Sequence, residues 1–340
     1  MREQVRRWLP AFTFATLLMP AGLALAEGAN GANGVNGDPA DARGWLARIH
    51  AAANQRNYQG TLVFSAGGAL SSSRVAHFCV GDQSYERLET LDGRQQRIYR
   101  QNDTLHTVWP QSRVVVQEKA GAMSSLPSST QVVEPRALER YELKAEGSDR
   151  VAGREAQVFL LQPRDDMRYA QRLWADKATG LMLRADVIGP KNQVLESTAF
   201  SEVEIGIKPQ PESVLQAMKK QDGYRVVRSQ QQRTQLDAEG WALDKPVPGF
   251  AFAGCMKRSV ESPDANGSDP VLQVVYSDGA THVSLFIEPF DARRAVVPLA
   301  GQLGATATLR QRRGDHWITV MGDVPASTLK VFAEALERRR

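Results

Sequence analysis

Residues 274–290 read VVYSDGATHVSLFIEPF, and this stretch indicates the fold more clearly than any other part of the chain. Two apolar, β-prone runs flank the turn residues Ser277, Asp278 and Gly279. The pattern predicts a β-hairpin in which Gly279 adopts a positive φ. No acid, base or metal-binding cluster surrounds the hairpin in the sequence, so the stretch favours binding over catalysis.

The hairpin belongs to a small C-terminal β domain that we expect over residues 241–336, followed by a basic tail at 337–340. After Pro325, Leu329, Phe332 and Leu336 recur at helical spacing and predict a C-terminal helix. The remaining periodicity predicts strands over residues 250–258, 271–276, 282–288, 305–310 and 316–321.

The first 26 residues have the pattern of a secretory signal peptide. Arg2, Arg6 and Arg7 precede an apolar run that ends in the small-x-small sequence Ala24-Leu25-Ala26, so we expect cleavage after Ala26 and an exported chain. The alternative is a membrane anchor, but the run is short for a span and is interrupted by prolines. Residues 27–40 are rich in Gly and Asn and predict a disordered leader.

The charge of the mature chain is nearly balanced. Removing residues 1–26 takes away three Arg and one Glu, which leaves 39 basic and 37 acidic residues and a net charge of +2. This balance does not indicate a nucleic-acid partner. About 300 residues are left, a length that favours two domains.

Residues 41–207 predict the larger, N-terminal domain. A helix with Trp45, Leu46 and Ile49 on one face begins at Asp41 as the N-cap, and a second helical stretch is expected near 135–143. Turn residues separate many short β-prone runs, a pattern typical of an antiparallel, up-and-down sheet. Residues 208–240 are polar and Gln-rich and predict an inter-domain connection with one short strand at Tyr224–Ser229. A connection of this length would let the domains reorient.

No catalytic, metal or cofactor site is predicted. The chain contains no nucleophile-elbow, zinc-protease, phosphate-loop or C-x-x-C motif, and its five histidines are scattered singly. Ser277, Asp278 and His282 are close in sequence, but turn chemistry explains them better than a catalytic triad. The two cysteines, Cys79 and Cys255, leave open either an inter-domain disulfide or two free thiols.

The large apolar residues of the N-terminal strands have two interpretations. They form either an ordinary core or the lining of a cavity for an acyl chain or a hydrophobic peptide. The residues predicted to face one side of the sheet as such a lining are Leu62, Phe64, Phe78, Val80, Trp109, Trp174, Leu181 and Leu183.

The order of several short motifs along the mature chain resembles the RseB/MucB family of periplasmic regulators of the envelope-stress sigma factor. These motifs are YQGTLVF at 58–64, ERLETLDG at 86–93, VAGREA at 151–156, LWADKATGL at 173–181, PGF at 248–250, the hairpin at 276–289 and TVMGDVP at 319–325. No single motif is specific, but their order over residues 41–336 is.

The resemblance implies a mainly β (α+β) protein, with a half-open, lipoprotein-carrier-like antiparallel barrel and a small C-terminal antiparallel sheet domain with a helix. It implies a periplasmic protein that is not an enzyme and needs no cofactor. The protein would bind the periplasmic region of a single-span membrane anti-sigma factor of the RseA/MucA type, shield it from proteolysis, and release it on sensing lipid or lipopolysaccharide.

The family supplies no contact residues that can be carried over one by one, so the predicted partner contacts come from the hairpin itself. They are Tyr276, Ser277, Asp278, Phe286 and Glu288. The alternative function is a periplasmic carrier of lipid or lipoprotein with a hydrophobic barrel cavity. An envelope hydrolase is the third interpretation, for which no nucleophile and base are visible. Homo-oligomers are left open.

Overall fold

The computed structural model describes residues 39–119, 133–260, 270–292 and 297–339. The predicted signal peptide and nearly all of the predicted leader lie outside the described residues. Within the described residues, no helix is long and apolar enough to cross a membrane.

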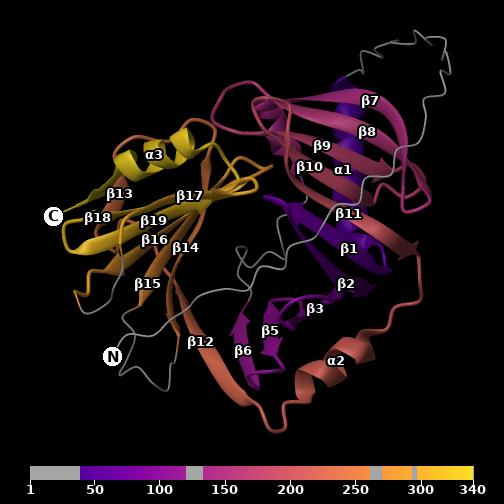
Figure 1. Ribbon diagram of the computed structural model, residues 1–340, viewed down its shortest axis with the longest axis horizontal. Coiled ribbons are helices and arrows are strands. Elements are labelled where there is room, and N and C mark those ends of the chain that lie inside the picture. The colour runs from indigo at the N-terminus through magenta and orange to yellow at the C-terminus, as the bar shows by residue number, and fades with distance from the viewer. Residues whose placement is uncertain (1–38, 120–132, 261–269, 293–296, 340) are drawn as a thin grey trace, which may run out of the picture. The chain divides into compact units, whose positions relative to one another are not determined.

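The N-terminal part is one sheet built from two meanders that meet at their first and last strands (Figure 1). The spatial order is β6-β5-β4-β3-β2-β1-β11-β10-β9-β8-β7, with every neighbouring pair antiparallel. Its elements are α1 (Pro39–Gln55), β1 (Tyr58–Ala66), β2 (Ala69–Val80), β3 (Gln83–Thr90), β4 (Arg97–Gln101), β5 (Thr104–Trp109), β6 (Val114–Lys119), η2 (Pro135–Glu139), β7 (Tyr141–Val151), β8 (Arg154–Pro163), β9 (Ala170–Asp176), β10 (Met182–Ile188) and β11 (Val194–Ile205).

Helix α1 packs on the strands of the second meander. Leu46 and Ile49 are fully buried against Phe159, Leu161 and Leu173, which explains the apolar spacing seen in the sequence. The helix begins at Pro39 rather than at an Asp41 cap. The expected second helix is a short 3₁₀ turn, because β7 already starts at Tyr141.

The segment predicted as an inter-domain connection contains the short strand that the sequence predicts and also a helix that it does not predict. It contains α2 (Pro211–Lys219) and β12 (Arg225–Arg233). Val214 and Met218 of α2 bury against Phe78, Tyr85 and neighbouring aromatic and aliphatic residues of the first meander. Only these two residues of α2 are buried, and the rest of the segment is mostly polar, so the sequence gives little sign of the helix.

Strand β12 joins the two sheets. Its first half pairs parallel with β6 from Arg225 to Arg228, and its second half pairs antiparallel with β14 from Ser229 to Arg233. The N-terminal sheet is therefore mixed rather than purely antiparallel. Since one strand is hydrogen-bonded into both sheets, the connection cannot act as a loose hinge.

The C-terminal sheet has the order β14-β15-β16-β19-β18-β17 and carries α3 on one face (Figure 1). Its core cluster includes Val274, Leu285, Ile318, Leu329 and Phe332. The elements are β13 (Trp241–Leu243), β14 (Ala251–Val260), β15 (Val271–Ser277), β16 (His282–Pro289), β17 (Leu299–Leu303), β18 (Thr306–Arg313), β19 (His316–Gly322), α3 (Ala326–Ala335) and β20 (Leu336–Arg338).

The predicted hairpin is confirmed, and it is formed by β15 and β16. Ser277 pairs with His282, and Gly279 has a φ of +94°. The short strands β13, β17 and β20 were not predicted. Because β20 pairs with β13 through Arg338 and Trp241, the expected basic tail begins inside a small two-stranded sheet. The predicted fold class, mainly β with a large N-terminal sheet and a smaller C-terminal antiparallel sheet, is confirmed.

Candidate functional site

The turn of the β15–β16 hairpin packs into the N-terminal sheet through one carboxylate. Asp278 Oδ1 accepts hydrogen bonds from the backbone N–H groups of Ala280 and Thr281, which closes the turn. Its Oδ2 accepts from Arg168 Nε at 2.7 Å and from the Tyr141 hydroxyl at 3.0 Å. The side chains of Arg168 and Asp278 are both 0% exposed, so this is a fully desolvated ion pair.

Arg168 makes three further contacts besides the one with Asp278. Its guanidinium also bonds Asp165, donates to the carbonyl of Pro248 at 3.1 Å, and lies 4.7 Å from the ring centre of Phe250. Gly249 has a φ of +77°, and a Cβ there would come 2.6 Å from Arg168 Nη2. The PGF motif is thus explained by the space that the arginine needs.

Backbone contacts reinforce this junction. The Glu134 N–H donates to the carbonyl of Gly279 at 2.7 Å, and the Thr328 hydroxyl donates to the carbonyl of Met167 at 2.7 Å. Burial is the main cause that raises the pKa of Tyr141, and the negative charge of Asp278 is the next. The phenol therefore stays protonated and donates to the carboxylate.

A second junction lies beside β12. Arg258 Nη2 is 2.6 Å from Glu118 Oε1, and Gln231 donates to the same oxygen at 3.1 Å. Arg258 also donates to Gln273 at 2.8 Å. The two junctions hold the sheets together at separate points.

The structure separates the predicted partner contacts. Tyr276 is in the core, 5.4 Å from the ring of Phe332, and Asp278 is buried in the junction. Ser277 is half-buried and donates to the carbonyl of Thr281. Phe286 and Glu288 alternate with core residues of β16 and therefore lie on the sheet face away from α3. These five residues do not form one exposed surface.

The predicted cavity lining is divided as well. In the β1–β2 register Leu62 pairs with Ser73, which places Phe78 and Val80 on the opposite face of the sheet from Leu62 and Phe64, so the expectation of one shared face is wrong. Phe78 packs under α2, and Val80 is exposed.

The other members of that predicted lining have different surroundings. Trp174 donates to Asp149 at 2.9 Å, and Trp109 is half-buried on β5. Leu62, Leu181 and Leu183 do line a cavity beneath α1, but its volume is about 40 Å³. That space holds about one water molecule and no acyl chain.

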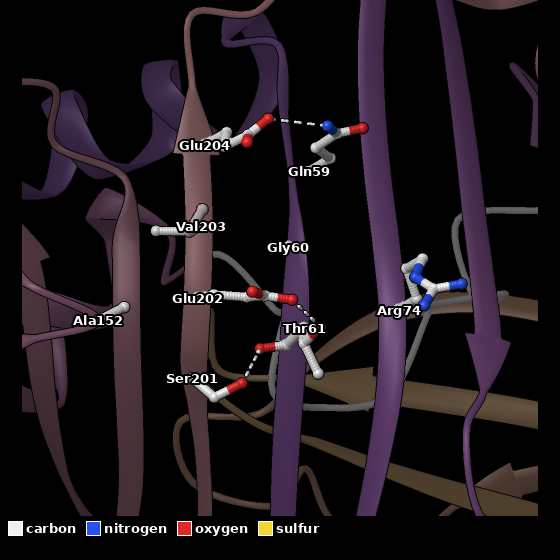
Figure 2. Close-up of a pocket in the computed structure, with 9 residues that line it drawn as sticks. All are labelled: Gln59, Gly60, Thr61, Arg74, Ala152, Ser201, Glu202, Val203 and Glu204. Atoms are coloured by element: carbon white, nitrogen blue, oxygen red, sulfur yellow. Dashed lines mark hydrogen bonds between the residues drawn. The ribbon is translucent and has the colours of Figure 1, made fainter.

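A larger, polar pocket of about 390 Å³ lies along β1 and β11 (Figure 2). Gln59 donates to Glu204 and Thr61 donates to Glu202, both at 2.8 Å, and Arg74 stands on the neighbouring strand. A Cβ at Gly60 would come 2.2 Å from the Glu202 carbonyl, so a side chain at this position would collide with the backbone of β11. The polar lining does not suit an acyl chain.

One cluster of chemically active residues was missed by the sequence reasoning. His77 bonds Glu86 at 3.2 Å and the Cys79 thiol at 3.2 Å, with Tyr58 stacked on the imidazole. The thiol donates to the carbonyl of Asn54 at 2.9 Å, and burial, followed by the charge of Glu86, raises its pKa. A protonated thiol is a poor nucleophile, so the cluster is structural.

Both cysteines are free thiols. Among the described residues, no group of three or more His, Cys, Asp or Glu is placed to hold a metal ion.

Two family models cover nearly all of this architecture. Residues 41–218 match the MucB/RseB N-terminal domain, and residues 235–337 match the MucB/RseB C-terminal domain. The sigma factor AlgU regulatory protein MucB of Pseudomonas aeruginosa is 31% identical over 306 residues, which cover 86% of this chain and 90% of that protein. The chain belongs to the MucB/RseB family.

Other members of the family agree with this assignment. The sigma-E factor regulatory protein RseB of Haemophilus influenzae is 23% identical over 88% of this chain and 91% of its own length. The crystal structure of MucB has a TM-score of 0.65 at 28% identity, covering 88% of this chain and 98% of that chain. MucB in complex with MucA(peri) has a TM-score of 0.64 at 28% identity, covering 89% of this chain and 100% of that chain. Members of the MucB/RseB family are regulatory proteins and not enzymes, as the sequence predicts.

Proposed function

We propose that this protein binds the periplasmic region of a membrane anti-sigma factor of the MucA type and so restrains an envelope-stress sigma factor. The observation that carries the proposal is the full-length likeness to MucB, solved both as the MucA/MucB complex of Pseudomonas aeruginosa and with MucA(peri). These two likenesses cover 88–89% of this chain and both sheets, at 28% identity.

The physical role is masking. A bound regulator covers the segment that a site-1 protease would cut, so the anti-sigma factor stays intact and the sigma factor stays sequestered. The function requires a protein interface and no catalytic group, which agrees with a chain whose buried ion pairs serve the fold. Export through the signal peptide, with cleavage after Ala26, is part of the same proposal.

A calorimetric titration of the mature chain with the recombinant periplasmic region of its cognate anti-sigma factor tests the binding. Saturable binding, together with slower cleavage of the anti-sigma region by the site-1 protease, is expected. The absence of a complex at micromolar concentrations would refute the proposal. Bovine serum albumin at the same concentration controls for non-specific protection from the protease.

Release by lipid or lipopolysaccharide is a further part of the proposal. The cavity beneath α1 is too small for an acyl chain, so a lipid that enters there must displace Ile49, which lines the cavity, from its packing. Lipid would then weaken binding of the anti-sigma region by a coupling of about 1–3 kcal/mol, roughly 5- to 150-fold in affinity. Binding that is unchanged by saturating lipopolysaccharide would remove the lipid switch and leave the masking role intact.

A further inference from the structure

A groove lies where three turns of the two sheets meet. Its volume is about 600 Å³. The β1–β2 turn contributes Gly67 and Gly68, and β17 with the turn after it contributes Gln302 and Gly304. The β10–β11 turn and the start of β11 contribute residues 190 and 193–196. A Cβ at Gly304 would come 2.7 Å from the Cβ of Ala66, so the turns are in direct contact and the walls of the groove are packed against each other.

Aliphatic side chains surround this groove and face solvent. Leu70 is 72% exposed, Val194 is 49% exposed and Leu303 is 67% exposed. Leu70 pairs with Ser65 of the lining, and Leu303 lies against Gly67. Three large aliphatic residues exposed around one concave surface are typical of an interaction site, because burying them in a complex is favourable.

The strand beside the groove has an open edge. All five residues of β17 are exposed, and among the described residues this strand pairs only with β18. Alternation along the strand places Leu299, which is 48% exposed, on the same face as Leu303. The free edge offers backbone donors and acceptors that an extended polypeptide can pair with.

The neighbouring strand β18 carries a group of positive charges. Arg310, Arg312 and Arg313 lie on β18, and within the described part of the chain none of them forms an ion pair with a carboxylate. A second copy paired at β17 would bring two such arginine sets together, which is unfavourable. An acyl chain would leave the strand edge unpaired. A polypeptide with aliphatic side chains and flanking carboxylates suits all three features.

We propose that an extended, aliphatic segment of the anti-sigma factor's periplasmic region adds as a strand to β17 and places its side chains in this groove. The inference rests on the proposed function and specifies its contact surface. Since the groove is formed by turns of both sheets, a segment bound there contacts both matched domains at once.

The variant Leu303→Asp tests the groove, and Leu91→Asp is its matched control, because Leu91 is also exposed, at 46%, but follows β3 and is not part of the groove. We expect Leu303→Asp to weaken binding of the recombinant periplasmic region at least tenfold and Leu91→Asp to change it less than twofold. Both variants should keep the wild-type thermal midpoint. Hydrogen exchange of the wild-type complex should show new protection of the amides of residues 299–303.

Wild-type affinity in Leu303→Asp, or unchanged exchange at β17 in the complex, would overturn the groove while leaving the proposed function standing. No binding by the wild-type chain would overturn both. Sedimentation analysis tests whether a second copy of the chain occupies the groove instead. If the wild type is a dimer, and Leu303→Asp dissociates it but still binds the anti-sigma region, the groove serves self-association and the inference is overturned.

Discussion

The sharpest prediction concerns the buried ion pair of Asp278 and Arg168. Replacing Asp278 with Asn keeps the shape of the side chain and the Oδ1 bonds to Ala280 and Thr281, so the turn is preserved. It removes the charge opposite a guanidinium that is 0% exposed. Breaking one side of a buried pair costs about 3–5 kcal/mol, because the remaining charge stays desolvated.

The lower end of that range applies here. Asp165, which is 31% exposed, still contacts Arg168 and compensates part of the lost charge. We therefore expect Asp278→Asn to lower the free energy of unfolding by about 3 kcal/mol. Asp165→Asn is the matched control on the same arginine. Because Asp165 is partly exposed to solvent, we expect this substitution to lower the free energy of unfolding by about 1 kcal/mol or less.

Urea unfolding followed by tryptophan fluorescence measures both values through the midpoint and slope. A double-mutant cycle with Arg168→Met isolates the pair, and we expect a coupling of about 1.5–3 kcal/mol between Arg168 and Asp278. A loss below about 1 kcal/mol for Asp278→Asn, or one equal to that of Asp165→Asn, would refute the idea that this pair holds the sheets together.

Three further predictions follow from single contacts. Gly60→Ala should cost about 2 kcal/mol or more, as overpacking typically does, because its Cβ meets the Glu202 carbonyl at 2.2 Å; an unchanged thermal midpoint would contradict this. Burial tends to raise the pKa of Asp176, but hydrogen bonds from Arg154 and Thr179 outweigh it and lower the pKa. The stability from this group is therefore present above the unfolded pKa of about 4 and is lost as the pH falls through the lower folded pKa. Asp176→Asn should accordingly reduce the fall of the urea midpoint at acidic pH. A variant whose urea midpoint falls with pH as steeply as that of the wild type would argue against this. The half-exposed thiol of Cys79 should react slowly with a thiol reagent in the native protein, and the buried cysteine only after unfolding; loss of both thiols to a disulfide in mass spectra would contradict the free-thiol state.

Local patterns in the sequence carried much of the fold. Gly279 could be assigned a positive φ from its place between two β-prone runs, and Leu46 and Ile49 could be assigned to a buried helix face from their spacing, because both inferences depend on near neighbours. The helix α2 was missed because Val214 and Met218 are its only deeply buried residues in a polar segment.

The register between neighbouring strands could not be predicted from such local patterns. Leu62 and Phe78 look alike as apolar strand residues, yet the β1–β2 pairing sends them to opposite faces, and a shift of one residue would have reversed this. The predicted lining for an acyl chain was divided for that reason. The same holds for Phe286 and Tyr276, which share a hairpin but not a face.

The sequence by itself determined that this is a mainly β, two-part member of the MucB/RseB family without catalytic chemistry, because motif order, turn residues and periodicity are local properties of the chain. Only the tertiary structure decided what Asp278 does. The sequence presents it as a turn residue open to a partner, while the fold buries it against Arg168, 110 positions away. It also decided that β12 ties the sheets together and that the exposed aliphatic residues gather beside β17, since long-range pairing and burial arise from the packing of distant segments.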